Sequence, residues 1–325
     1  MKKSFLMVLA VAIVGAGVTP VSAEAASSKK KVVAAKKKQI RVVIQSRSSG
    51  SGFKRVKHIQ QAQRSITLDD AQHLALQSSA VLVQDQATGA VLFEKNSNSV
   101  LPIASITKLM TAMVSLDAQP NLSETLTIGD EDVDLLKGTR SRLKVGTQLS
   151  REEMMRLALM SSENRAASAL SRHYPGGRPA FIRAMNLKAK SIGLNDTRFE
   201  DPTGLTSANV SSPRDLARMV DAAHQYPLIR EFSTTSDGEF NVAGRVQQFN
   251  NTNMLVKNST WEIGLSKTGY INEAGKCLVM QAWLNNKPII IVLLDSWGKM
   301  TRIADAQRIK RWIESAALQP RPSTS

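Results

Sequence analysis

Ser105 and Lys108 lie three positions apart in this 325-residue chain, a spacing at which a hydroxyl and an amine can act together. Apolar residues at helical intervals from Ile106 to Leu116 predict a helix there, which places both side chains on one face near its start. A serine hydroxyl becomes a good nucleophile when a base removes its proton. A lysine can be that base when burial or a neighbouring cation disfavours its ammonium form. Ser105 is therefore the candidate nucleophile and Lys108 its candidate base.

A second pair of polar side chains, Ser162 and Asn164, falls where one predicted helix ends and the next begins. The first of these helices spans Arg151 to Met160, and a capping box of Ser150 and Glu153 opens it. At a helix junction beside a cleft, the serine could relay a proton and the asparagine could bind a substrate amide or steady the candidate base. Taken alone, this motif is equally typical of an ordinary helix junction.

The third motif, Lys267-Thr268-Gly269, occurs once and lies within a strand predicted over Glu262 to Asn272. A strand edge can pair with an extended peptide, and Gly269 would let that peptide approach closely. Lys267 and Thr268 offer a positive charge and a hydroxyl to a terminal carboxylate. Lys267 could also be the cation that disfavours the ammonium form of Lys108.

Strands are predicted near both ends of the sequence, and helices between them. A hairpin is expected around Thr88-Gly89, and a meander near the C-terminus is followed by a helix over about Arg302 to Ala317. This order predicts an α/β (α+β) domain over residues 67–319, with one sheet built from both ends of the chain and a helical lobe in the middle. The catalytic cleft would lie between them. The expected strands and the remaining helix are Ala80 to Asp85, Ala90 to Lys95, Glu262 to Asn272, Lys276 to Leu284, Pro288 to Leu294, and the helix from Pro213 toward His224.

The first 25 residues read as an export signal. Two lysines precede the apolar run from Phe5 to Val18, and small residues follow, which places cleavage after Ala23 or Ala25. The alternative is an uncleaved anchor, but the run is shorter than the ~20 residues of a spanning helix. The mature chain is expected in the periplasm, with no transmembrane segment after cleavage and with peripheral association to wall or membrane left open. Residues 320–325 are a short C-terminal tail.

The net charge of +16 is concentrated in a basic tail, residues 26–66. Residues 26–65 contain twelve Lys or Arg and no Asp or Glu, and the stretch from Ser48 to Gly52 resists ordering. The tail is either a solvated linker or a tether to anionic envelope polymers or lipid headgroups. Nucleic acid is not an expected partner, because the chain is exported and the tail contains one aromatic residue, Phe53.

Neither a metal site nor a cofactor is predicted. The four histidines, at positions 58, 73, 173 and 224, are scattered, and no H-x-x-x-H pair is present. The single cysteine, Cys277, lies in an apolar run, so buried packing is favoured over catalysis.

The three motifs, together with Phe199 to Leu205 and Ser212 to Leu216, resemble the low-molecular-mass penicillin-binding proteins. The chain is most similar to their D-alanyl-D-alanine endopeptidase branch, of the penicillin-binding protein 7 type. The resemblance covers residues 67–319 and not the basic tail. It implies the penicillin-binding transpeptidase/β-lactamase-like fold, with a central antiparallel sheet of about five strands, flanking helices and a helical lobe.

The resemblance also implies roles for individual residues. Ser105 would form the acyl-enzyme with Lys108 as its base, while Ser162 and Asn164 would assist proton transfer and substrate placement. Lys267, Thr268 and Gly269 would bind the substrate, and the backbone N–H groups of Ser105 and Tyr270 would form the oxyanion hole. The resemblance leaves open the effect of Glu163, the acid in the middle of the second motif.

The leading hypothesis is a serine endopeptidase that hydrolyses cross-links between peptidoglycan stem peptides, with β-lactams as covalent inhibitors. A carboxypeptidase that trims stem pentapeptides would use the same residues, so it stays open. A non-catalytic wall-binding scaffold that works through its basic tail is the alternative from another class. A β-lactamase is disfavoured, because the chain lacks the E-x-x-L-N segment that would supply a deacylating base.

Overall fold

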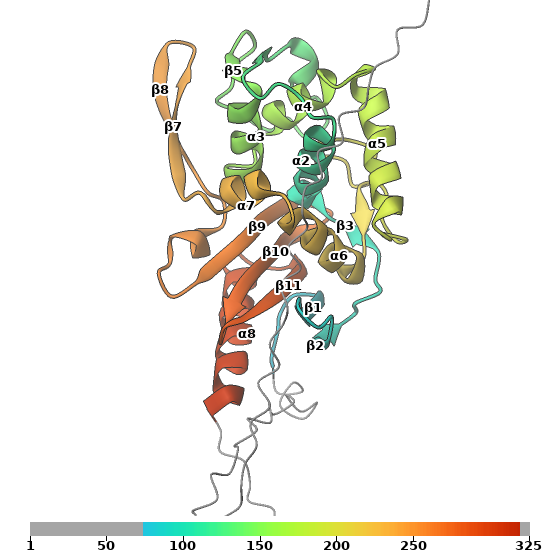
Figure 1. Cartoon of the computed structure of the whole chain (residues 1–325), viewed down its shortest axis with the longest axis vertical. Coiled ribbons are helices and arrows are strands. Elements are labelled where there is room, and N and C mark those ends of the chain that lie inside the picture. The colour runs from blue at the N-terminus through green and yellow to red at the C-terminus, as the bar shows by residue number, and fades with distance from the viewer. Residues whose placement is uncertain (1–73, 319–325) are drawn as a thin grey trace, which may run out of the picture. The chain divides into compact units, whose positions relative to one another are not determined.

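The computed structural model describes residues 74–318, and its centre is a five-stranded antiparallel sheet (Figure 1). The strand order is β2-β1-β11-β10-β9, so strands from both ends of the chain lie side by side, as predicted. β9 carries the third motif and is an edge strand of this sheet. The strands are β1 (Ala80–Asp85), β2 (Val91–Lys95), β9 (Glu262–Ile271), β10 (Gly275–Leu284) and β11 (Lys287–Ser296).

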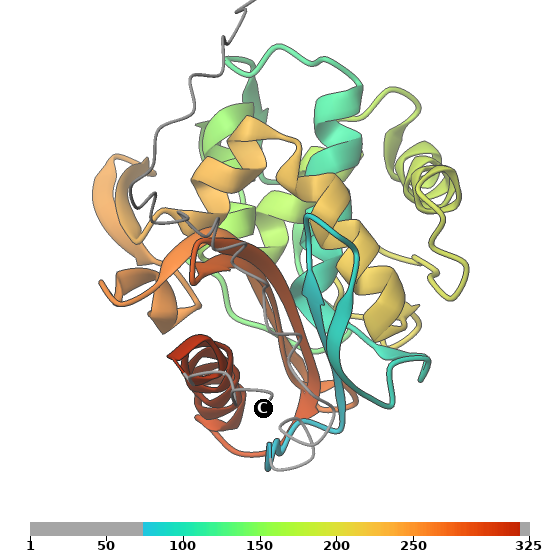
Figure 2. The same cartoon turned by 60° about the horizontal axis from the view of Figure 1, so that its bottom comes forward.

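The three central strands of the sheet, β1, β11 and β10, are buried on both faces. In the β1–β11 pair, Leu82 opposes Val292 and Val81 opposes Leu293. Because side chains alternate along a strand, the first pair faces the larger apolar core under the helical lobe and the second faces the core under α8. Figure 2 shows α8 on one face of the sheet and the other helices on the opposite face. This burial explains why these strands read as continuous apolar runs.

The part of the chain between β2 and β9 forms the helical lobe. Its helices are α2 (Lys108–Asp117), α3 (Arg151–Met160), α4 (Asn164–Arg172), α5 (Gly177–Ser191), α6 (Pro213–His224) and α7 (Pro227–Thr234), and α8 (Thr301–Leu318) closes the described chain. The 3-10 turns are η1 (Ala104–Thr107), η2 (Asp130–Asp132) and η3 (Met254–Lys257). Three short pairs of strands complete the fold: β3 (Leu101–Pro102) with β6 (Val210–Ser211), β4 (Thr125–Thr127) with β5 (Gln148–Ser150), and β7 (Asp237–Val242) with β8 (Arg245–Asn250).

The helix-start signals in the sequence correspond to real caps. Ser150 accepts a hydrogen bond from the Glu153 N–H at 3.1 Å, and the Glu153 carboxylate accepts one from the Ser150 N–H at 2.7 Å. This is the predicted capping box at the start of α3. At α6 the Ser212 hydroxyl accepts from the Asp215 N–H, and Pro213 occupies the first turn. These caps fix where the helices behind the candidate site begin.

Cys277 is fully buried on β10, as its sequence context predicted. Its thiol donates to the carbonyl of Ala274 at 3.4 Å, and burial raises the pKa of the thiol to about 11. The expected export signal, basic tail and C-terminal tail lie outside the described residues. Among residues 74–318, no helix combines the length and apolarity needed to cross a membrane.

Candidate active site

Ser105 lies in the η1 turn, immediately before α2, and is partly exposed. The helix begins at Lys108 rather than at Ile106, because the residues from Ala104 to Thr107 form the tighter 3-10 turn. Ala104 has a φ of +48°, a conformation that costs free energy for a residue with a side chain and recurs at functional sites. The strained turn presents the Ser105 hydroxyl beside the start of α2.

Lys108 is completely buried, and its side-chain nitrogen contacts three oxygen atoms. Its Nζ lies 2.9 Å from Ser105 Oγ, 2.7 Å from Asn164 Oδ1 and 2.7 Å from the carbonyl oxygen of Thr203. Burial lowers the pKa of Lys108 to about 7, while the carboxylates of Asp201 and Glu163 oppose this shift. Lys108 therefore has a substantial neutral fraction at neutral pH, as a general base requires.

The three contacts of Lys108 fit the neutral amine. A neutral amine has two N–H bonds and one lone pair. Asn164 Oδ1 and the Thr203 carbonyl can only accept, so they take the two N–H bonds. The lone pair then faces the Ser105 hydroxyl, which can donate to it at 2.9 Å. This arrangement is the one needed to withdraw the serine proton.

Lys267, on β9, is the second buried lysine of the site. Its Nζ donates to Ser162 Oγ at 2.9 Å and to the carbonyl of Thr268 at 2.9 Å. Burial lowers its pKa well below the usual value, and the positive charges of Lys108 and Arg302 lower it further. The sequence left open whether burial or the cation of Lys267 would lower the pKa of Lys108. Burial is the principal cause of the lowered pKa of Lys108. The charge interaction between the two lysines instead lowers the pKa of Lys267.

Gly269 brings the edge of β9 against the serine turn. A Cβ atom at this position would lie 2.8 Å from the Ile103 carbonyl oxygen and 3.1 Å from the backbone nitrogen of Ser105, so only glycine allows this approach. The Gly269 carbonyl accepts from Arg302 at 3.2 Å. Since the carbonyl and N–H of one peptide unit point in opposite directions, the Tyr270 N–H points away from Arg302. The oxyanion hole formed by the backbone N–H groups of Ser105 and Tyr270 stays a prediction.

The second motif joins α3 to α4, as predicted, and Ser162 adopts a φ of +63° in this junction. Asn164 uses its carbonyl for Lys108, and its Nδ2 donates to Thr139 Oγ1 at 3.2 Å. On β9 the Thr268 hydroxyl lies 2.6 Å from that of Thr252. The structure therefore brings the polar side chains of all three motifs together.

Four contributors to this site were given no role in the sequence analysis. Thr203 acts through a backbone carbonyl, which no side-chain pattern reveals. Thr139, Thr252 and Arg302 come from distant parts of the chain, and only the folded structure shows that they meet the motifs. Asp201 accepts from the backbone N–H groups of residues 203, 204 and 206 and so shapes the loop that carries the Thr203 carbonyl. An aspartate at such a turn is a signal that the sequence does carry.

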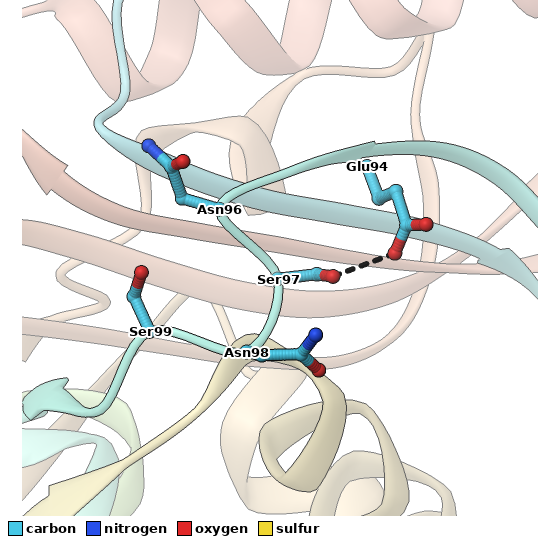
Figure 3. A pocket seen from close by; sticks show the side chains of 5 residues that line it. All are labelled: Glu94, Asn96, Ser97, Asn98 and Ser99. Carbon is cyan, nitrogen blue, oxygen red and sulfur yellow. Dashed lines mark hydrogen bonds between the residues drawn. The ribbon is translucent and has the colours of Figure 1, made fainter.

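A surface pocket of about 460 Å³ lies elsewhere, on the loop after β2. Its walls come from Glu94 and the residues from Asn96 to Ser99, and the Ser97 hydroxyl donates to Glu94 at 2.6 Å (Figure 3). None of the motif residues lines it, so this pocket is separate from the candidate site. Residues 74–318 also contain no cluster of three or more side chains suited to hold a metal ion.

Comparison with known proteins gives consistent matches across the described chain. The family model Peptidase_S11, described as D-alanyl-D-alanine carboxypeptidase, matches residues 67–298. A D-alanyl-D-alanine endopeptidase of Pseudomonas aeruginosa is 49% identical over 252 residues, covering 77% of this chain and 81% of that protein. The D-alanyl-D-alanine endopeptidase of Escherichia coli is 48% identical over 250 residues, covering 76% and 81%.

The solved structures agree with the sequence matches. The Streptomyces K15 DD-transpeptidase superposes with a TM-score of 0.68 at 28% identity, covering 74% of this chain and 98% of that one. The penicillin-binding fold expected from the motifs is therefore confirmed. The chain belongs to the Peptidase_S11 family of serine D-Ala-D-Ala peptidases.

Proposed function

We propose that this chain is a D-alanyl-D-alanine endopeptidase that hydrolyses peptide cross-links in peptidoglycan through an acyl-enzyme on Ser105. The observation that carries the proposal is the buried Lys108 amine, 2.9 Å from the serine hydroxyl and held by two acceptors that leave its lone pair for the serine proton. The relatives named as endopeptidases support the choice of reaction, since they match most of the chain at almost half identity.

Acylation follows from this geometry. Lys108 Nζ takes the proton of the Ser105 hydroxyl while Oγ attacks the carbonyl carbon of a D-alanyl residue. The N–H groups of Ser105 and Tyr270 stabilise the negative charge on the carbonyl oxygen. The C–N bond then breaks, and the proton that Lys108 took from Ser105 passes through the Ser162 hydroxyl to the leaving amine, which makes Lys108 neutral again. Lys267 holds the Ser162 hydroxyl in this relay. The products of this step are the ester on Ser105 and the amine of the second stem.

In deacylation, Lys108 accepts a proton from water and then returns one to Ser105. Water attacks the ester carbonyl and gives up a proton to Lys108, and the Ser105 oxygen recovers a proton as the C–O bond breaks. The free D-alanyl carboxylate is released. Residues 74–318 form no E-x-x-L-N segment to speed this step, so a penicilloyl adduct is expected to be long-lived.

The edge of β9 provides the substrate-binding surface. An extended stem peptide can pair with this edge strand, which Gly269 allows to lie against the serine turn. Lys267 and Thr268 then receive the carboxylate next to the scissile amide, a charge-assisted interaction. A carboxypeptidase would use the same surface, and the description of the matching family keeps that activity as the second candidate.

The remaining parts of the chain have proposed roles that rest on the sequence. Residues 67–319 form the peptidase domain, and residues 1–25 direct export to the periplasm. The basic tail over residues 26–66 tethers the enzyme to anionic polymers of the envelope, because clustered cations gain free energy from polyanions. If the tail were the only working part, the chain would be a scaffold, and Ser105 would be dispensable.

The test is digestion of a purified cross-linked muropeptide dimer, with Ser105→Ala as the control. The wild type is expected to produce monomers and to form a covalent adduct with a fluorescent penicillin. The variant should lose at least about 10³-fold in rate, and it should form no adduct. Mass spectrometry of the products separates the alternatives: an intact dimer with loss of one alanine from a pentapeptide indicates a carboxypeptidase. No change in either substrate, with no adduct on the wild type, would favour the scaffold.

A further inference from the structure

Glu163 is a buried acid in the middle of the second motif that the mechanism above does not use. It is the N-cap residue of α4, yet its side chain makes no capping hydrogen bond. Its carboxylate instead turns to the segment from Thr139 to Leu143, where it accepts from Ser141 Oγ at 2.6 Å. Only 9% of Glu163 is exposed, so this contact lies in a region of low solvent access. A buried carboxylate requires such partners to persist.

The Ser141 contact fixes this segment against the second motif. Ser141 Oγ also accepts from the Leu143 N–H at 3.0 Å, so its own hydrogen is free for Glu163. Arg165, on α4, donates to the Leu143 carbonyl at 2.9 Å. At the other end of the segment, Thr139 accepts from Asn164 Nδ2. The segment therefore touches the same asparagine that holds Lys108, and Glu163 anchors it there.

The charges around Glu163 favour its ionised form. Arg142 Nε lies 4.0 Å from its carboxylate, and Arg142 is itself held by the Gln248 carbonyl and by the ring of Phe249, 3.6 Å away. Burial raises the pKa of Glu163, while the Ser141 hydrogen bond and the positive charges of Arg142, Lys108 and Arg165 oppose that shift. The Glu163 carboxyl group is thus held next to Asn164, among cations that favour its ionised form against the effect of burial.

Lys108 is surrounded by groups of both signs. Asp201, on the loop after α5, and Glu163, on α4, favour its ammonium form, while burial disfavours it. Burial lowers the pKa of Lys267, on β9, and the charges of Lys108 and of Arg302 on α8 lower it further. Of the two carboxylates, Asp201 is committed to the backbone of its own loop. Glu163 contacts no substrate-binding group directly, so its charge can be removed without removing a motif residue.

We propose that Glu163 is a positioning residue for acylation, whose carboxylate anchors the 139–143 segment on Asn164 and places a negative charge beside the asparagine that holds Lys108. The inference rests on Ser105 and Lys108 being the nucleophile and base. A negative charge near the amine keeps the amine protonated to higher pH. Removing the charge should therefore extend the active range toward acid.

The experiment measures the rate constant for acylation by a fluorescent penicillin between pH 5.5 and 9 on the full-length enzyme. Glu163→Gln removes the charge and keeps an oxygen that can accept from Ser141. Its acid limb is expected to move to lower pH by roughly 0.5 to 1 unit. Glu163→Leu supplies a second neutral variant of similar size, and melting temperatures establish that each variant is folded.

Two matched variants keep the carboxyl group. Ser141→Ala removes the hydrogen bond, and its plateau rate should fall by about three- to tenfold. Because this bond opposes the effect of burial on the pKa of Glu163, the acid limb of Ser141→Ala should move, but by less than that of Glu163→Gln. Glu163→Asp keeps the charge and should leave the limb in place. An unmoved limb in both neutral variants would overturn the proposal, and so would an equal shift in Ser141→Ala, since a loosened segment would then explain it. Absence of any adduct on the wild type would instead contradict the proposed function.

Discussion

Replacing Lys108 by Met should reduce acylation of Ser105 by roughly 10³- to 10⁴-fold while leaving the protein folded. Methionine has nearly the shape of lysine and suits a buried position, but it cannot accept a proton. The loss would come from the missing base, because the serine turn and Gly269 are unchanged. The measurement is the rate of labelling by a fluorescent penicillin, compared with the melting temperature of the same sample. Labelling at the wild-type rate would exclude Lys108 as the base.

The same variant predicts a change in the pH dependence of stability. Lys108 has a folded pKa of about 7 and an unfolded pKa near its usual value of 10.5. Between these values the unfolded chain binds more protons, so the free energy of unfolding of the wild type rises with pH across this window. The Met variant should lack this part of the slope. Lys310→Arg, on α8, is the control. This lysine pairs with Glu314 on the helix that covers the other face of the sheet, so the change should affect neither rate nor slope.

Replacing Gly204 by Ala should destabilise the protein by about 3–5 kcal/mol and remove most of its activity. A Cβ atom there would lie 1.9 Å from the carbonyl oxygen of Ala104 and 2.9 Å from the backbone nitrogen of Ser105, and the backbone has a φ of +83°. The clash is with backbone, which cannot rotate away. It would displace the serine turn and the neighbouring Thr203 carbonyl that Lys108 contacts. Chemical denaturation and penicillin labelling measure the two effects.

Gly193→Ala is the matched control for this prediction. Gly193 has a φ of +74°, close to that of Gly204, but a Cβ atom there would meet nothing within 4 Å. Its cost should be limited to the backbone conformation, about 1–2 kcal/mol. Equal losses of stability and activity in the two variants would mean that the close approach of Gly204 to the serine turn contributes to neither.

The elements that carry the motifs could be predicted because their signals are local. The capping box at Ser150, the Pro213 helix start and the apolar strands each depend on neighbouring residues, and all were confirmed. The β7–β8 hairpin received no prediction. Its turn has Ala243 at a φ of +51° followed by Gly244 at +77°, where Asn or Asp would have given the usual turn signal.

The chemistry of the site could be predicted only as far as side-chain types allow. The motifs indicated Ser105 and Lys108, but not the cause of the lowered pKa, since burial of a lysine depends on packing between segments far apart in sequence. The Thr203 carbonyl and the Arg302 contact to Gly269 likewise arise from long-range packing. The contact between Glu163 and Ser141 also depends on this long-range packing.

The buried thiol of Cys277 makes the β9–β10 pair a place where native-state opening can be timed. Cys277 pairs with Gly269 across the two strands, so the third motif and the thiol share one stretch of the ladder. A thiol of pKa about 11 with no solvent access does not react with an alkylating reagent while the strands are closed. The slow alkylation rate would therefore report how often this part of the sheet separates. A bound penicillin that stabilises the strand edge would make the alkylation slower still. Because Cys277 is a native residue, this measurement needs no engineered label.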